Sequence, residues 1–449
     1  MRERRQIVLA VIGWLLWMNF PLYLALMELW MVPETARVVI HVALAFMGGT
    51  LISRVRCPYP TRRLKRLGEA SRNLAVFLAA ATVQLVWFLA AWLALCPAVF
   101  PTGRIVITAI VSVVLLAGLF WWNMIAIYLT SVQLGLKHRV LAALCGWIPG
   151  LNIWYLTKMI RITAQEAEFE TEKWELDTAR AESEICKTRY PILMVHGVFF
   201  RDYRFLNYWG RIPRELQRNG ATIYYGQQQS AAAVEDSGRE LAERIRSIVE
   251  ETGCGKVNII AHSKGGLDSR AAIAHWGMAP YVATLTTINT PHRGCIFAEY
   301  LLGKIPEAVR QKIAHTYNTT LRHLGDADPD FLAAVTDLTA SACEARNAVT
   351  PDAPEVVYES VMSYCRKAQH GKFPLNMTHP IVKHFDGKND GLVSVESAKW
   401  GSRFTLLEPQ GKRGISHGDV VDLNRENLPG FDVREFYVAL VSSLKERGF

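Results

Sequence analysis

The hydrophobic residues of this chain are concentrated in long uncharged segments within its first third. Residues 7–27, 73–103 and 105–136 contain no Asp, Glu, Lys or Arg, and residues 38–53 form a shorter segment of the same kind. A helix needs about 20 apolar residues to cross the hydrocarbon core of a bilayer. Buried helices of a soluble core are the alternative, but they seldom run so far without a charge. We therefore predict four transmembrane helices, the one at 38–53 spanning only together with its N-terminal flank.

A fifth uncharged stretch, residues 140–157, is interrupted by Gly146, Pro149, Gly150 and Asn152. Proline and glycine in the middle of such a stretch favour two short helices that lie at the membrane interface or re-enter the membrane. A straight fifth span is the alternative. It would place everything that follows on the other side of the bilayer.

The cations are gathered at the ends of these segments, although the net charge of +9 alone would also suit a nucleic-acid-binding protein. The loop before residue 73 contains one acidic residue, Glu69, and a cluster of basic residues: Arg54, Arg56, Arg62, Arg63, Lys65, Arg66 and Arg72. Cytoplasmic loops are enriched in Lys and Arg, so both ends of the four-helix region are expected in the cytoplasm. The basic loop also suits anionic lipid headgroups, and no nucleic-acid partner is expected.

The eight cysteines show no CxxC pair and no spacing typical of a metal site. Five of them follow the membrane region, so at least one of those five is free. This favours a reducing compartment.

After a charged segment at 164–188, which indicates a solvated connecting helix, the chain alternates between strand-like and helix-like runs. The expected strands are residues 192–195, 222–225, 257–260, 282–288, 381–385 and 404–407. This alternation predicts an α/β domain with a mostly parallel sheet covered by helices on both faces. The predicted organisation is a transmembrane region at 1–163, a charged linker at 164–189 and an α/β domain at 190–449 with a helical insertion around 296–365.

The strand at 257–260 runs directly into Ala261-His262-Ser263-Lys264-Gly265 and then into a helical segment. A strand, a tight turn with small flanking residues and a helix form a nucleophile elbow, which exposes a strained serine hydroxyl at the end of a sheet. Ala261 stands where the common pattern has glycine, a mild departure because alanine also lacks bulk. The pattern predicts that Ser263 is a nucleophile, and a turn without chemistry is the alternative.

A serine attacks an acyl carbon only if a base takes its proton and donors meet the oxyanion. The strand at 192–195 ends in His196-Gly197-Val198. The backbone N–H groups of Val198 and Lys264 are the predicted oxyanion donors. His196 is expected to be a structural turn residue rather than the base.

In hydrolases with such an elbow, the acid and then the histidine follow the serine along the chain. One downstream loop offers two acids, Asp386 and Asp390, and a later loop carries His417. This order favours His417 as the base over His292 and His384.

The segment from Tyr190 to about Gly448 resembles the bacterial triacylglycerol lipases of the α/β-hydrolase superfamily. The resemblance rests on His196-Gly197, Tyr208-Trp-Gly-Arg-Ile-Pro-Arg-Glu-Leu, Gly220-Ala-Thr-Ile-Tyr-Tyr, Lys256-Val-Asn-Ile-Ile-Ala-His-Ser-Lys-Gly-Gly, Thr290-Pro-His-Arg-Gly294 and Asn389-Asp-Gly-Leu-Val. It covers slightly over half of the chain. It implies an α/β-hydrolase fold with Asp390 as the acid and His417 as the base, and no required cofactor.

Those lipases often bind a structural calcium ion close to the histidine, through an aspartate two residues after it. Asp419 matches that position. A helix N-cap before residues 420–423 is the alternative role for Asp419.

Together these features predict a membrane-anchored serine ester hydrolase of lipase or carboxylesterase type, which cleaves acyl esters of lipids through an acyl-enzyme on Ser263. The expected partners are the lipid bilayer and a membrane lipid or another acyl ester. The expected location is a bacterial inner (plasma) membrane, with the catalytic domain in the cytoplasm. The helical insertion would form a lid over the site or an ordinary set of core-facing helices.

Two other functions are compatible with parts of this pattern. A lipid acyltransferase or a phospholipase would use the same triad. A non-catalytic membrane module with a vestigial hydrolase domain is less favoured, because nucleophile, acid, base and oxyanion loop are all present.

Overall fold

The computed structural model describes residues 2–53, 58–91, 100–198, 207–323, 325–373, 375–408, 410 and 413–449. The chain divides into two compact units, Met1–Thr178 and Ala179–Phe449. Arg54, Arg56, Cys57 and Cys96 lie outside the described residues, and so does part of the segment predicted at 73–103.

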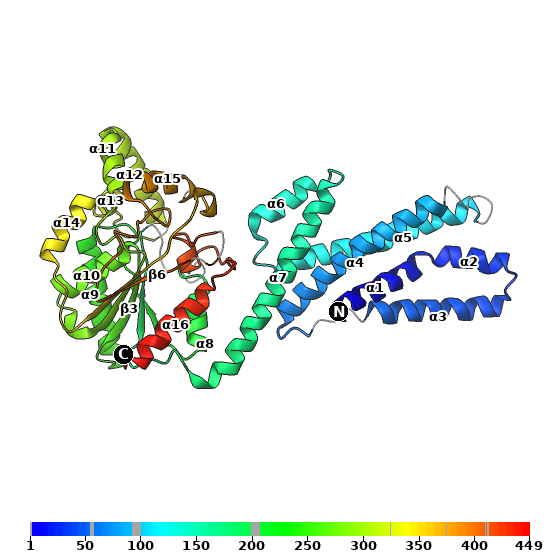
Figure 1. Ribbon diagram of the computed structural model, residues 1–449, viewed down its shortest axis with the longest axis horizontal. Coiled ribbons are helices and arrows are strands. Elements are labelled where there is room, and N and C mark those ends of the chain that lie inside the picture. Colours follow the sequence, from blue (N-terminus) through cyan, green and yellow to red (C-terminus); the bar gives the residue numbers. More distant parts are fainter. Residues whose placement is uncertain are drawn as a thin grey trace. The chain divides into compact units, whose positions relative to one another are not determined.

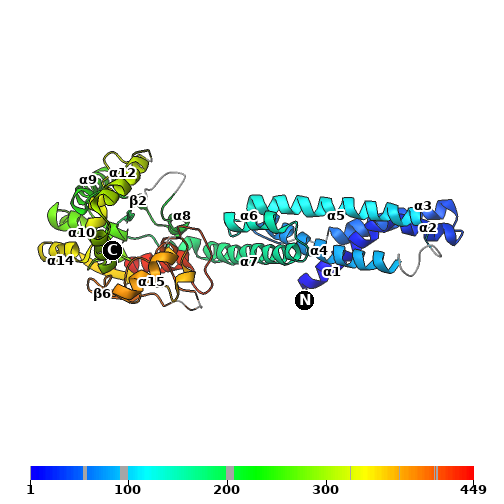
Figure 2. The same ribbon diagram turned by 90° about the horizontal axis from the view of Figure 1, so that it is seen from above.

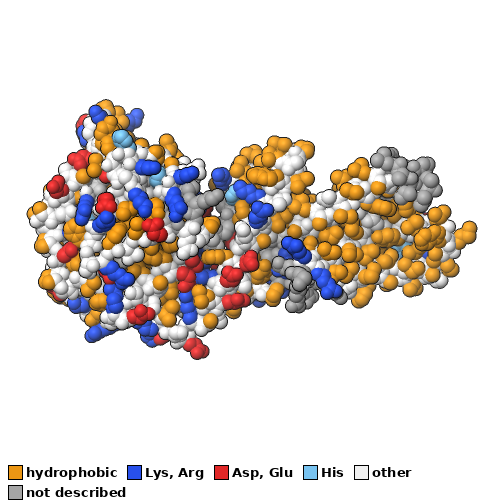
Figure 3. Space-filling view, viewed as in Figure 1, with side chains coloured by type: hydrophobic (Ala, Val, Ile, Leu, Met, Phe, Trp, Pro, Cys, Tyr) orange, Lys and Arg blue, Asp and Glu red, His pale blue; other side chains and the backbone are white. Residues whose placement is uncertain are grey.

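In its described part, the first unit is built of helices joined by short loops and contains no strand (Figure 1). Its helices are α1 (Arg2–Met18), α2 (Phe20–Leu29), α3 (Glu34–Ile52), α4 (Arg62–Ala90), α5 (Thr102–Thr130), α6 (Gly135–Cys145) and most of α7 (Leu151–Arg180). Helices α3, α4 and α5 are each long and apolar enough to cross a membrane. The pair α1 and α2 would be a fourth span if its two parts, which are bent by 61°, are counted as one. Hydrophobic side chains cover the outer surface of these helices (Figure 3).

Polar side chains inside the helical unit satisfy one another. Asn19, at the break between α1 and α2, donates to Gln84 Oε1 of α4 (2.9 Å). Gln84 in turn donates to Ser112 Oγ of α5 (3.1 Å). All three side chains are buried, and hydrogen bonds of this kind fasten helices together where apolar surroundings offer no water.

The stretch predicted to be broken at its Pro-Gly centre forms a helical hairpin. Helix α6 ends at Cys145, and α7 begins at Leu151. Gly150 has φ +80°, a left-handed conformation that glycine adopts at little cost. From there α7 continues without interruption into the charged segment and ends at Arg180.

The second unit contains a six-stranded sheet in the order β2-β1-β3-β4-β5-β6, and every neighbouring pair is parallel. The strands are β1 (Ile192–Val195), β2 (Ile223–Tyr225), β3 (Val257–His262), β4 (Val282–Ile288), β5 (Val357–Met362) and β6 (Arg403–Leu406). Strands β1, β3 and β4 are buried along their whole length, which explains why most of their residues are apolar.

Helices cover both faces of this sheet (Figures 1 and 2). The helices are α8 (Ile212–Arg218), α9 (Val234–Thr252), α10 (Lys264–His275), α11 (Ile296–Lys304), α12 (Glu307–His323), α13 (Phe331–Thr336), α14 (Ala340–Val349), α15 (Leu375–Asp386) and α16 (Val433–Glu446). On one face, α8 and α16 pack against Ile192, Met194 and Ile260. On the other face, α9 and α10 pack against alternate residues of the same strands, including Leu193 and Ile259. The predicted α/β architecture is thus confirmed.

One predicted strand is wrong. Residues 381–385 belong to α15, where His379 and Val382 are buried three residues apart, as expected for one face of a helix. The strand that the prediction missed is β5, within the segment taken for a helical insertion. This strand contains the charged residue Glu359, whose carboxylate is bound by Arg447, directly after α16, at 2.7 and 2.9 Å.

Candidate active site

Ser263 occupies the tight turn between β3 and α10, with φ +54° and ψ −130°. Positive φ is unfavourable for a residue with a Cβ, so the surrounding packing has to impose it. A Cβ on Gly265 would lie 2.4 Å from the carbonyl oxygen of His196, and a Cβ on Gly266 would lie 2.3 Å from Thr290 Oγ1. The close approach of strand and helix therefore requires the small residues that follow the serine.

Asp390 and His417 come together after the ends of β5 and β6. The Nδ1–H of His417 donates to Asp390 Oδ2 at 2.7 Å, and the backbone N–H of His417 donates to the carbonyl of Asp390 at 3.0 Å. The other carboxylate oxygen accepts from the N–H groups of Leu392 (2.9 Å) and Val393 (2.8 Å). Asp390 is fully buried, so these donors replace water around its charge.

Asn289 completes the surroundings of this carboxylate, and sequence reasoning did not identify it. Its amide donates to Asp390 Oδ2 at 2.6 Å, and its Oδ1 accepts from the N–H of Ser363 at 3.0 Å. Asn289 directly follows β4 and has φ +49°, a conformation that asparagine tolerates better than most residues. The sequence feature that could have identified Asn289 is its position directly before Thr290-Pro291, at the end of a predicted strand.

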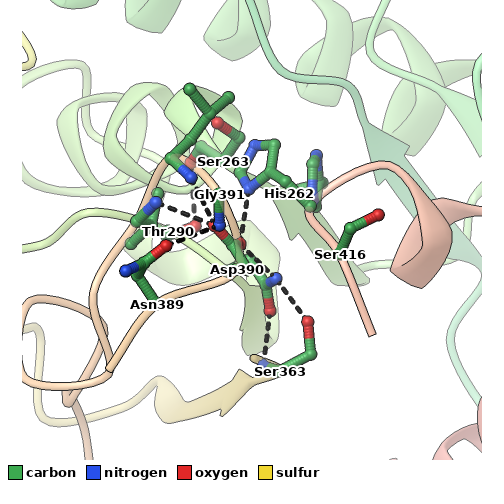
Figure 4. A network of polar contacts seen from close by, with 12 residues as sticks. His262, Ser263, Thr290, Ser363, Asn389, Asp390, Gly391 and Ser416 are labelled. Atoms are coloured by element: carbon green, nitrogen blue, oxygen red, sulfur yellow. Dashed lines mark hydrogen bonds and ion pairs between the residues drawn. The ribbon is translucent and has the colours of Figure 1, made fainter. Parts of the chain in front are cut away.

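Ser263 lies close to the pair formed by Asp390 and His417. Figure 4 shows Ser263, His262 and Asp390 gathered at the ends of the strands. The ring of His262 is 4.4 Å from that of His417 between centroids. Within the described part of the chain, the hydroxyl of Ser263 makes no hydrogen bond, so it is not committed to another partner.

His262 is held in its neutral form beside His417. Burial, together with the nearby His417, lowers the pKa of His262 well below its ordinary value. A hydrogen bond of 2.5 Å joins His262 Nδ1 to the hydroxyl of Tyr208. A neutral His262 adds no positive charge of its own beside His417.

The two predicted oxyanion donors both lie next to Ser263. Gly197 passes so close that a Cβ there would be 2.9 Å from Ser263 Cβ, and Val198 follows it. Lys264 opens α10, where the helix dipole favours negative charge. In the described ranges, neither N–H donates to another protein group.

Comparisons with known proteins agree with this geometry. A family model described as "Putative serine esterase (DUF676)" matches residues 213–334. A triacylglycerol lipase of Pseudarthrobacter phenanthrenivorans is 35% identical over 180 residues, covering 37% of this chain and 55% of that protein. A triacylglycerol lipase of Burkholderia plantarii is also 35% identical, covering 37% and 49%. Part of the chain is therefore similar to bacterial triacylglycerol lipases. It spans about half the length of these curated relatives.

Solved lipase structures are also similar to part of this chain. A Bacillus licheniformis lipase is 22% identical with a TM-score of 0.43, covering 56% of this chain and 91% of its own. A Staphylococcus hyicus lipase is 17% identical with a TM-score of 0.46, covering 58% and 97%. The fold is assigned from the strand order of the sheet and from the turn at Ser263 rather than from these similarities.

A buried ion pair supports the turn between β3 and α10 in the α/β domain. Lys264 Nζ lies 2.6 Å from Asp268 Oδ1 one turn along α10, and donates to Ser237 Oγ of α9 at 3.0 Å. Both charged side chains are almost fully buried. Burial raises the pKa of Asp268 to about 6, while Lys264 acts in the opposite direction.

The Lys264→Met variant is expected to lower the Tm of the domain by roughly 10 °C at pH 8, because it leaves the carboxylate of Asp268 buried without a cation. The pKa of Asp268 is higher in the folded state than in the unfolded state. The folded protein therefore loses stability as the pH rises through the folded-state pKa. Without Lys264 the folded-state pKa of Asp268 rises further. The carboxyl is then protonated in the folded protein at pH 5, so the decrease in Tm should largely disappear at that pH. Thermal unfolding at the two pH values measures this. The double variant Lys264→Met/Asp268→Asn should recover most of the Tm at pH 8, and a failure to recover would contradict the assignment.

Asp419 does not present a calcium site. Its carboxylate accepts from Ser416 N (3.0 Å) and Ser416 Oγ (2.7 Å), and Arg413 Nη2 lies 3.2 and 3.3 Å from its two oxygens. Arg413 also contacts Glu426, so a guanidinium supplies the positive charge that a metal ion would bring. The alternative of a helix N-cap is wrong as well, because Gly418 holds that position before the short helix Asp419–Val421.

Arg413→Ala is expected to lower the Tm by about 5 °C, because a buried carboxylate next to His417 loses its charged partner. A chelator added to the unmodified protein should leave the Tm unchanged. Differential scanning calorimetry of both samples checks this. A chelator effect as large as that of the substitution would restore the calcium hypothesis.

The remaining histidines near the site have structural surroundings. Both ring nitrogens of His196 lie at hydrogen-bond distance from backbone carbonyls, those of Gly197 (2.8 Å) and Gln228 (3.1 Å). His292 is stacked on Trp400 at 5.2 Å, and burial lowers its pKa well below the ordinary value. These contacts agree with the expectation that neither is the base.

Proposed function

We propose that this protein is a membrane-anchored serine ester hydrolase of lipase or carboxylesterase type, with Ser263, Asp390 and His417 as its catalytic triad. The observation that carries the proposal is the hydrogen bond of 2.7 Å between His417 and the buried Asp390, on a loop beside the strained turn of Ser263. A serine on a tight turn, followed along the chain by a buried aspartate and then a histidine, provides the groups that acyl transfer requires.

The reaction follows from the positions of these groups. His417 Nε2 takes the proton of Ser263 while Oγ attacks the acyl carbon, and Asp390 stabilises the imidazolium through Nδ1–H. The N–H groups of Val198 and Lys264 stabilise the oxyanion. Collapse of the intermediate releases the alcohol, which receives its proton from His417. Water, activated by the same histidine, then cleaves the acyl-enzyme and regenerates Ser263.

Acyl lipids are the substrate class that we propose. The curated relatives named above are triacylglycerol lipases. Apolar side chains are exposed in the insertion and around α15, with Val309 of α12 at 47%, Phe373 just before α15 at 78% and Met377 of α15 at 61%. Val198 packs against Leu321 of α12 and Ala334 of α13, so the insertion contacts the expected oxyanion loop. An apolar insertion at this place supports a lid that admits an acyl chain.

The helical unit supports an anchor in the bacterial inner (plasma) membrane. Its long apolar helices and the basic loops at one end agree with a cytoplasmic catalytic domain. Protease digestion in intact cells and in inside-out vesicles tests the sidedness. Cleavage of the catalytic domain in intact spheroplasts would place it on the opposite side.

Covalent labelling and product analysis test the chemistry. The protein in nanodiscs should react with a fluorophosphonate, and mass spectrometry should map the adduct to Ser263. The same preparation should release free fatty acid from emulsified triacylglycerol. Transfer of the acyl group to an added alcohol or amine in preference to water would favour an acyltransferase, and release only from phospholipids would favour a phospholipase. Absence of any adduct would favour a non-catalytic module.

A further inference from the structure

We propose that the hairpin formed by α6 and the start of α7, residues 135–158, is an interfacial anchor that binds the headgroup region of an anionic lipid surface. This goes beyond ester hydrolysis. It rests on the membrane insertion in the proposed function, and it is independent of the proposed chemistry.

The hairpin exposes more apolar surface than a solvated element would tolerate. Eight of its large apolar side chains are exposed: Leu136, Val140, Leu144, Trp147, Ile148, Leu151, Ile153 and Trp154. Trp147 is 90% exposed and Leu136 is 78% exposed. Figure 3 shows that hydrophobic side chains, in orange, predominate on the surface of the hairpin. Contiguous apolar patches of this kind mark contacts with another apolar phase.

The opposite face of the hairpin is already occupied. Tyr155, Leu156 and Met159 of α7 are buried against residues of α4 and α5, among them Leu74 and Ile127. Figure 1 shows α6 and α7 beside the ends of these two helices. A hydrogen bond of 2.7 Å between His138 Nδ1 and the Tyr155 hydroxyl joins the two arms. The hairpin therefore cannot turn its apolar residues inward, and they need an external partner.

The size of the hairpin and its cations limit how deep it lies. Helix α6 has 11 residues. At about 1.5 Å per residue it is roughly half as long as the hydrocarbon core is thick. Lys137 and Arg139 stand in its first turn and Lys158 two turns into α7. Lysine and arginine extend towards the headgroups, and tryptophan is enriched at that same level. These features place the hairpin at the interface rather than in a re-entrant loop.

The charge of this region selects anionic lipids. No Asp or Glu occurs between Glu69 and Glu166. Glu166 itself is buried and accepts from Ser131 Oγ (2.6 Å) and from Arg63 (2.8 Å), so it does not neutralise the exposed cations. Lys158 Nζ lies 5.5 Å from the ring of Trp154, which puts a cation and an interfacial aromatic at one level. Anionic headgroups complement this arrangement, and a second protein would require acidic groups at the same spacing.

Depth-resolved photo-crosslinking tests the location. The full chain carrying Ser263→Ala, so that lipid probes stay intact, is placed in nanodiscs of phosphatidylcholine and phosphatidylglycerol. A phospholipid with a diazirine near its ester groups should label residues 147–154. A phospholipid with the diazirine at its acyl terminus should label residues 113–118 in the middle of α5 but not the hairpin. Equal labelling of the hairpin by the terminal probe would overturn the proposal in favour of re-entrance. No labelling by either probe would overturn it in favour of a protein partner.

Charge variants test the lipid selectivity. Replacing phosphatidylglycerol by phosphatidylcholine should lower labelling of 147–154 by the ester-level probe about fivefold. Lys137→Gln/Lys158→Gln should cause the same loss in the anionic discs. The matched variant Lys187→Gln/Lys312→Gln, which removes two exposed cations outside the hairpin, should leave labelling unchanged. Equal labelling in neutral and anionic discs, or equal losses in the two variants, would overturn the anionic preference. None of these readouts depends on ester hydrolysis.

Discussion

Ser263→Ala is expected to lower kcat on a soluble short-chain acyl ester about a million-fold, to the residual rate supported by substrate binding and the oxyanion donors. No other hydroxyl can replace the nucleophile, because the turn between β3 and α10 fixes a single side chain at the end of the sheet. Hydrolysis of the ester by purified protein in detergent measures the effect. Fluorophosphonate labelling should be lost in parallel, and the Tm should stay the same or rise, since alanine keeps the small volume that the turn requires.

Ser269→Ala is the matched control for this prediction. Ser269 is a buried serine of the same helix, and its hydroxyl donates to the carbonyl of Gly265 at 2.7 Å. Its loss removes one local hydrogen bond and no reacting group, so kcat should change little. Undiminished labelling or activity of Ser263→Ala would show that another residue is the nucleophile.

The buried strands could be predicted from the sequence because buried positions are occupied mainly by apolar residues. Strands β1 and β4 begin and end where their hydrophobic runs do. Strand β5 could not be recognised, because its glutamate is neutralised by Arg447, a residue far along the chain. The α1–α2 break was likewise hidden in one uncharged run, since the polar partners of Asn19 lie on other helices.

The choice between the two acids of one loop also depended on tertiary contacts. Asp386 Oδ atoms accept from the N–H groups of Ile296 and Phe297 at 3.3 Å, so this side chain caps α11. Asp390, four residues later, faces His417. The surrounding sequence does not show which of the two aspartates is the catalytic acid. Only the resemblance to lipases favoured Asp390. Asn289 was missed for the same reason, because its partner is brought to it by the fold.

The contacts of Asp390 determine what an isosteric amide would do in its place. One carboxylate oxygen accepts from two backbone N–H groups, so an amide at residue 390 must keep its oxygen there. Its NH2 group would then face the Asn289 amide and His417 Nδ1, which are donors now. His417 would have to accept at Nδ1 and carry its proton on Nε2, the nitrogen that should take the proton of Ser263.

Asp390→Asn is therefore expected to lower kcat about 10⁴-fold with a much smaller change in KM. The substitution changes the tautomer of the base and leaves the apolar substrate contacts in place. Asp386→Asn in the same loop is the matched control, and it should retain kcat because its partners are the first backbone amides of α11. Measurement of kcat and KM for the two variants on one ester separates the roles. If Asp386→Asn lost more activity than Asp390→Asn, the acid would have been assigned to the wrong residue, and the hydrogen bond to His417 would be structural rather than catalytic.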